Sequence, residues 1–200
     1  AISSSDYTST CLQSIFNSRF PIGCSKQSAN FYKIYDSQIN LLSVLKNNGY
    51  HLYGTLDESL CLLGMNEPME NSDVAFQKLE SNIYTDLGPK ILKIIKNVQE
   101  PWFYYVHVED LHFPITLPKE FDNEKFGSSK YERKVSALDN WLGKLLEKID
   151  LKNTLVIITS DHGAYIKSVN NSNLNINLEV NGELQTYVRN FGNLIPKPLQ

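Results

Sequence analysis

Extended hydrophobic runs alternate with helical hydrophobic patterns over most of this chain, and that alternation restricts the folds it can adopt. Segments 50–55, 102–108 and 154–159 are short, rich in aromatic or β-branched residues, and of strand length. Apolar residues recur at spacings of three and four over 128–150, which predicts a long amphipathic helix. We therefore predict an α/β fold with a mainly parallel central sheet and helices on both faces.

Weaker patterns surround these elements. We expect short helices over 11–18 and 91–98, and a helix capped near Asp36 that ends at Gly49. The Asn-rich region after Gly163 contains two short alternating segments of strand type, at 174–180 and 184–188.

Composition excludes several classes of function. The 200 residues are 42% hydrophobic, so the chain is expected to bury a core. Its net charge of -3 gives no electrostatic basis for nucleic-acid binding, and we predict no nucleic-acid partner. No apolar run reaches the roughly 18 residues of a membrane span, although an anchor preceding residue 1 is compatible with the sequence.

The cysteines do not indicate a disulfide framework or a zinc knuckle. Their number is odd, and no two are separated by only two residues. We expect Cys24 and Cys61 to be buried side chains that act as small hydrophobes.

The strongest chemical signal is the sequence Ser-Asp-His-Gly that follows the apolar run 154–159. Ligands of open α/β sheets bind at the carboxyl ends of the strands, where this sequence lies. A glycine at position 163 permits a turn that directs Asp161 and His162 toward one point. A carboxylate and a neutral imidazole suit zinc, manganese or a similar divalent ion, so both residues are predicted metal ligands.

The segment LKNTLVIITSDHG at 151–163 resembles the C-terminal metal segment of the alkaline phosphatase/sulfatase superfamily. Segments 41–50, 105–118 and 134–154 resemble three other parts of that family, in the same order. Within the second of these, His112 matches the substrate-contacting histidine of the family.

The resemblance covers about residues 5–166. It implies an alkaline-phosphatase-like catalytic domain over 1–166. The Asn-rich residues 167–200 would form a C-terminal extension of that domain with β structure.

The resemblance also indicates a nucleophile. Thr8 lies thirteen positions before Pro21, which is the family's spacing between nucleophile and proline. At a helix N-terminus, the dipole and the amide groups favour an alkoxide and an anionic substrate. Ser9 and Thr10 remain alternatives if the loop differs in length. The rival is Cys11, because Cys-Leu-Gln-Ser is similar to the sulfatase signature that is converted to formylglycine. The signature's proline and arginine are absent, so we predict that Cys11 is a packing residue.

A threonine nucleophile is typical of lipoteichoic acid synthases and phosphoethanolamine transferases within this family. The resemblance therefore implies a metal-dependent enzyme that transfers phosphoryl groups or hydrolyses phosphodiesters. Thr8 would be both nucleophile and metal ligand, and Asp161 and His162 would complete the ligands of one divalent ion, Mn, Zn, Mg or Ca. His112 would contact the substrate, a phosphate or sulfate ester. A sulfuric ester hydrolase and a non-catalytic module on the same fold are the alternatives. The sequence does not determine the location, and the resemblance is compatible with the extracytoplasmic face.

Parts of the family's metal site have no counterpart in the sequence. The family takes carboxylate ligands from the end of a first strand that precedes the nucleophile, but only Asp6 precedes Thr8. We expect that strand and its carboxylate before residue 1. No histidine follows His162, which predicts a site for a single ion.

The remaining polar residues are predicted to have supporting roles. We expect His107 to lie in the core or behind the site, His51 to be structural, and Asp110 to support the site. The Lys and Glu residues of 119–134 are predicted to form a solvated face.

Overall fold

The computed structural model describes residues 3–5, 7–18, 39–71, 82–112 and 114–163, together with the backbone of strands 174–180 and 183–189. The chain divides into two compact units, Ala1–Ala164 and Tyr165–Gln200. Asp6, Pro21, Cys24 and Asp36, which were singled out in the sequence, lie outside the described residues.

The first unit is built around a parallel pair of strands. Strand β1 (His51–Thr55) pairs in register with β2 (Trp102–Val106), so that Thr55 lies opposite Val106. One further hydrogen bond, from the amide of His107 to the carbonyl of Thr55 at 3.0 Å, continues the pairing beyond the strand ends. The structure confirms the predicted α/β class and the parallel pairing.

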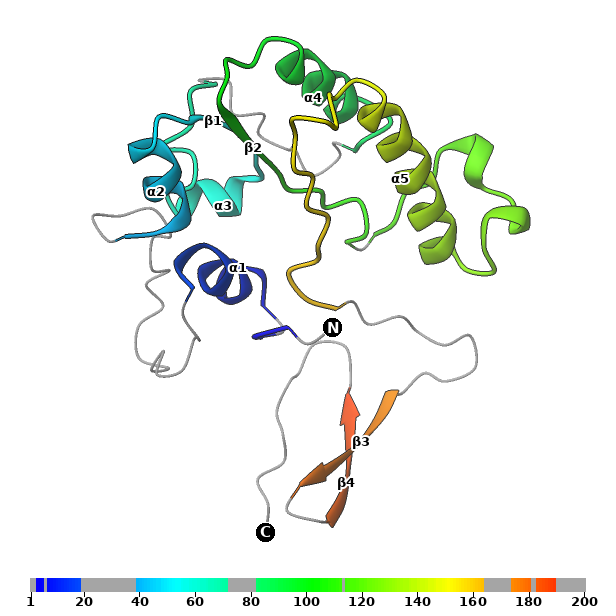
Figure 1. Ribbon diagram of the computed structural model, residues 1–200. Helices are drawn as coiled ribbons and strands as arrows, with labels where there is room; N and C mark the ends of the chain where they lie inside the picture. The colour runs from blue at the N-terminus through cyan, green and yellow to red at the C-terminus, as the bar shows by residue number, and fades with distance from the viewer. Residues whose placement is uncertain are drawn as a thin grey trace. The chain divides into compact units, whose positions relative to one another are not determined.

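Three helices pack against one face of the pair: α1 (Thr8–Asn17), α2 (Leu41–Asn47) and α3 (Glu58–Leu62) (Figure 1). Their buried apolar residues form one core, against which two side chains of β2 also pack. The core consists of Leu12, Phe16, Leu42, Leu52, Leu56, Leu60, Leu63 and Met65, with Phe103 and Tyr105 beside it.

Helices α4 (Leu87–Ile95) and α5 (Lys130–Leu146) pack against the opposite face. The buried residues of this second core are Ile83, Leu87 and Ile91, and the neighbours packed against it include Tyr104, Val106, Leu138, Trp141 and Leu145. Successive residues of a strand point to opposite faces, and the residues of β2 alternate between the two cores accordingly. Helices therefore cover both faces, as predicted (Figure 1).

Side-chain caps set where the helices begin. Helix α5 begins after Ser129, whose hydroxyl accepts the amide of Glu132 while that carboxylate accepts the amide of Ser129. The helix predicted from Asp36 begins instead at Leu41, because Asn40 forms the same kind of reciprocal cap. The sequence analysis missed α3.

The strand predicted over 154–159 is absent from the structure, in which this segment has no regular secondary structure. Leu155, Ile157 and Ile158 are 84%, 75% and 68% exposed. An extended backbone gains ladder hydrogen bonds only from a neighbouring strand. Among the described residues β1 and β2 pair with each other and not with this segment. The apolar pattern predicted burial correctly for β1 but wrongly for 154–159.

The second unit contains an antiparallel pair, β3 (Leu174–Val180) and β4 (Glu183–Arg189). These strands confirm the two strands predicted in the Asn-rich region. Within the described parts of the chain, no helix has both the length and the apolar character needed to cross a membrane.

Two helical glycines give opposite expectations for substitution by alanine. A Cβ atom on Gly88 of α4 would clash with the carbonyl oxygen of Ile83 and lie 2.5 Å from Nε1 of Trp141, whereas nothing lies within 4 Å of one on Gly143 of α5. We expect Gly88→Ala to lower the free energy of unfolding, because this clash outweighs the gain in helix propensity of about 1 kcal/mol. Gly143→Ala is expected to raise it by roughly 0.5–1 kcal/mol. Urea unfolding followed by circular dichroism measures both values, and stabilisation by Gly88→Ala would contradict the close packing of α4 on α5.

Candidate active site

The carboxyl ends of β1 and β2 bring several polar side chains to one edge of the sheet. Asp57 comes two residues after the end of β1, and His107 and Glu109 follow the end of β2. Because the strands are parallel and in register, these residues lie at the same edge.

Thr8 and His162 meet although 154 positions separate them in the sequence. Oγ1 of Thr8 lies 3.1 Å from Nε2 of His162, and that nitrogen lies 3.5 Å from Oδ2 of Asp161. All three side chains are partly buried. We call these three residues the threonine group.

The backbone around His162 sets the direction of its ring. Nδ1 lies 2.8 Å from the carbonyl oxygen of Gly163, which can only accept a hydrogen bond. Nδ1 therefore carries the proton, and in the neutral ring Nε2 presents its lone pair to Thr8. The other oxygen of Asp161, Oδ1, accepts the amide of His162 at 2.8 Å and holds the turn.

The atoms of the threonine group suit a shared metal ion. Two ligands bonded to one ion at about 2.1 Å lie roughly 3.0–3.4 Å apart, close to the 3.1 and 3.5 Å measured here. A hydroxyl, a carboxylate and an imidazole with a free lone pair are a donor set for zinc or manganese. The hydrogen bond of the other ring nitrogen to a carbonyl is the usual support for a ligating histidine.

Thr8 is the first residue of α1, which places its hydroxyl at the positive end of the helix dipole. The preceding residue, Tyr7, makes no side-chain cap, and the first amide bonded within the helix is that of Cys11. The amides of the first turn before Cys11 therefore have no acceptor within the helix and are available to an anionic group at the helix start. An edge-to-face contact of Phe16 with Tyr105, at 5.1 Å between centroids, fixes α1 against β2.

Cys11, on the same helix, is enclosed by the protein. It is 1% exposed, and its thiol donates to the carbonyl oxygen of Ser5 at 3.1 Å. The structure agrees with the prediction that Cys11 is a packing residue. Cys61 is partly buried on α3, and its burial raises the pKa of the thiol.

His112 lies on the loop after β2 and is exposed. Its amide donates to the carbonyl oxygen of Glu109 at 2.8 Å. The structure thus relates His112 to Glu109, and the threonine group forms without it.

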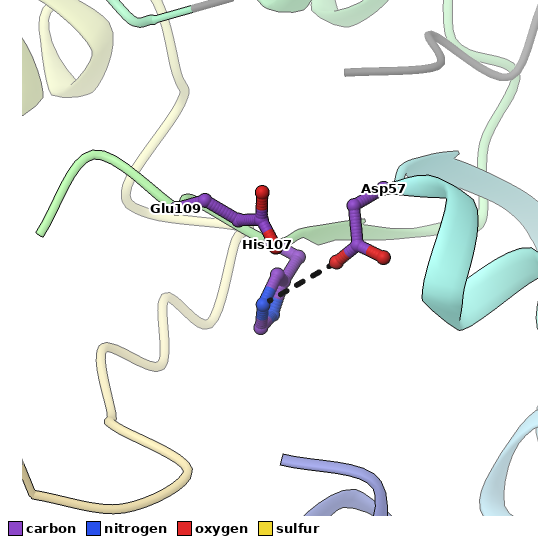
Figure 2. A group of neighbouring side chains, drawn as sticks. All are labelled: Asp57, His107 and Glu109. Atoms are coloured by element: carbon purple, nitrogen blue, oxygen red, sulfur yellow. Dashed lines mark ion pairs between the residues drawn. The ribbon is translucent and has the colours of Figure 1, made fainter. Parts of the chain in front are cut away.

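A second cluster at the sheet edge consists of Asp57, His107 and Glu109, which point toward one another in Figure 2. We call these residues the Asp-His-Glu group. Nε2 of His107 lies 3.6 Å from Oδ2 of Asp57. The sequence analysis placed His107 in the core or behind the site and missed both carboxylates. Their positions just beyond two predicted strands were the signal that could have identified them.

The two groups share neighbours on β2 and just beyond it. Burial raises the pKa of Tyr105 well above its ordinary value, and the charges of Asp161 and Asp57 add to this effect. Burial lowers the pKa of His107, against the charges of Asp57 and Asp161. Carboxylates of both groups are thus close enough to act on the same two side chains, so the groups form one electrostatic environment.

A buried ion pair holds the loop that carries these residues. Nζ of Lys134, on α5, lies 2.6 Å from Oδ1 of Asp110, with the two side chains 1% and 0% exposed. The same carboxylate accepts the amide of Ile83. The prediction of a solvated face over 119–134 is therefore wrong at Lys134, which is buried. Asp110 anchors the loop between Glu109 and His112.

The sequence pattern of the family described as Sulfatase matches residues 1–188. This chain belongs to the sulfatase family. The match confirms the predicted resemblance and places the chain among sulfatase-like hydrolases and transferases, which generally bind a divalent metal ion.

One curated relative shares part of the sequence. Over 75 residues, which are 38% of this chain, the sequence is 36% identical to that of an uncharacterized protein of Haemophilus influenzae. The matched part is 11% of the length of that relative. No solved structure matches the chain.

Proposed function

We propose that this sulfatase-family protein is a metal-dependent enzyme that transfers the phosphorus group of a phosphodiester, with one of its two ester substituents still attached, to Thr8 and then to water or an alcohol. The observation that carries the proposal is the 3.1 Å contact between the Thr8 hydroxyl and His162, at the N-terminus of α1. Such a position favours both an alkoxide and an approaching anionic ester. Thr8, Asp161 and His162 would hold the ion.

Each residue has a defined task in this reaction. A bound divalent ion lowers the pKa of a hydroxyl that it contacts and offsets the charge of the ester. Oγ1 of Thr8, having released its proton to solvent water, forms a bond to phosphorus while the bond to the leaving oxygen breaks. His112 contacts the ester and supplies the proton that the leaving oxygen takes up. The intermediate is a phosphodiester of Thr8 that keeps the second ester substituent. Water or an alcohol then attacks its phosphorus and gives up a proton, the bond between phosphorus and Oγ1 breaks, and Oγ1 regains a proton.

Sulfate-ester hydrolysis is the second candidate, because the family is described as Sulfatase. In its formylglycine form it requires a modified cysteine in contact with the substrate. Cys11 is buried and directed toward Ser5, which makes it unsuited to that role. The phosphodiester reaction is therefore the better supported of the two.

Mass spectrometry separates these candidates. After brief incubation with an aryl phosphodiester and acid quenching, we expect the peptide that contains Thr8 to gain the mass of the diester less one aryl alcohol. A Thr8→Ala variant treated in parallel should yield the unmodified peptide. Formylglycine at Cys11, together with turnover of an aryl sulfate, would favour the sulfatase alternative.

A further inference from the structure

We propose that Asp57, His107 and Glu109 form a second divalent-cation site beside the threonine group. The sequence predicted a single ion, held by Thr8, Asp161 and His162. The second site requires none of these residues and concerns binding of an ion, so it does not rest on the proposed reaction.

The separations of the ligand atoms support this site. One ligand atom from each residue lies within 4.8 Å of those of the other two. Two ligands of a tetrahedral ion with bonds of about 2.1 Å lie about 3.4 Å apart, and the Asp57–His107 separation is 3.6 Å. A separation of 3.6 Å is too long for a hydrogen bond. Glu109 is exposed and can approach the other two by side-chain rotation.

Neighbouring contacts orient two of the ligands. Nδ1 of His107 lies 3.1 Å from the hydroxyl of Tyr105, which fixes the ring with Nε2 toward Asp57. Oδ1 of Asp57 accepts the amide of Leu60 at 2.9 Å and thereby turns Oδ2 toward His107 (Figure 2). Metal-ligating side chains in proteins are commonly held by such outer contacts.

The charges of the cluster also favour a cation. Two carboxylates, one of them buried, lie close together beside His107, so their negative charges repel each other. A divalent ion relieves this repulsion, and a proton shared by the two carboxyl groups is the competing way to do so. With mixed oxygen and nitrogen ligands, zinc and manganese are the suitable ions.

Calorimetric titration with zinc or manganese tests the site. We expect the chain to bind two ions, and an Asp161→Asn/His162→Gln variant to bind one. Adding Asp57→Asn or His107→Gln to that variant should weaken the remaining binding by at least about tenfold. Asparagine keeps an oxygen for the Leu60 amide, so Asp57→Asn preserves the cap of α3.

Two further variants keep the result interpretable. Glu109→Gln changes an exposed side chain and should also weaken the remaining site at least about tenfold without unfolding the chain. Glu70→Gln is the matched control, because Glu70 pairs with Nδ1 of His51 at 3.0 Å as an exposed pair outside the cluster. It should leave both sites unchanged. A double variant that binds no ion, as a shared proton predicts, would overturn the proposal, as would binding insensitive to Asp57→Asn, His107→Gln and Glu109→Gln.

Discussion

Replacing Thr8 by alanine is expected to lower the turnover of an aryl phosphodiester by at least about a thousandfold, because the proposed covalent intermediate forms on its hydroxyl. The hydroxyl of Thr8 is the one that contacts His162 at the start of α1. Its loss also removes one of three proposed metal ligands. The kcat for release of the aryl alcohol measures the effect.

Variants of the next two residues provide the controls. Ser9→Ala and Thr10→Ala each remove one hydroxyl from the first turn of α1 and retain the backbone amides. We expect both to keep kcat within about threefold of the parent, because their hydroxyl groups lie outside the threonine group. Thr8→Ser, which retains an oxygen at the same position, should recover part of the activity. Undiminished turnover by Thr8→Ala, with loss in Ser9→Ala or Thr10→Ala instead, would move the nucleophile along the helix.

The sequence was most informative where one short segment contains both the structure and the chemistry. Asp161 and His162 are adjacent and precede a glycine, so their common direction could be inferred locally. Thr8 required the family resemblance, because nothing near it in the sequence indicates its contact with His162. The structure brings these three together, and their roles remain predictions.

Pairing partners and tertiary contacts explain what the sequence did not reveal. Asp57 follows β1 in a region without clear periodicity, and its proximity to Glu109 depends on the register of β1 with β2. The apolar pattern of 154–159 predicts burial but does not specify a neighbouring strand. Lys134 lies among polar residues on α5, and only the position of Asp110 explains its burial.

The second large effect that we expect is a loss of stability when the buried ion pair between Lys134 and Asp110 is broken. Lys134→Met should lower the free energy of unfolding by about 3–5 kcal/mol, because it leaves the carboxylate of Asp110 buried without its counter-charge. That loss is a large part of the roughly 5–15 kcal/mol that stabilises a typical domain. Urea unfolding followed by circular dichroism measures it.

A surface pair of the same residue types is the matched control for Lys134→Met. Nζ of Lys90 lies 3.2 Å from Oδ2 of Asp86, with the side chains 47% and 42% exposed, so Lys90→Met should change the free energy of unfolding by no more than about 0.5 kcal/mol. Adding Asp110→Asn to Lys134→Met should restore part of the loss, since the amide oxygen still accepts the Ile83 amide and no buried charge remains. Equal effects of Lys134→Met and Lys90→Met would show that the buried pair does not anchor the loop after β2.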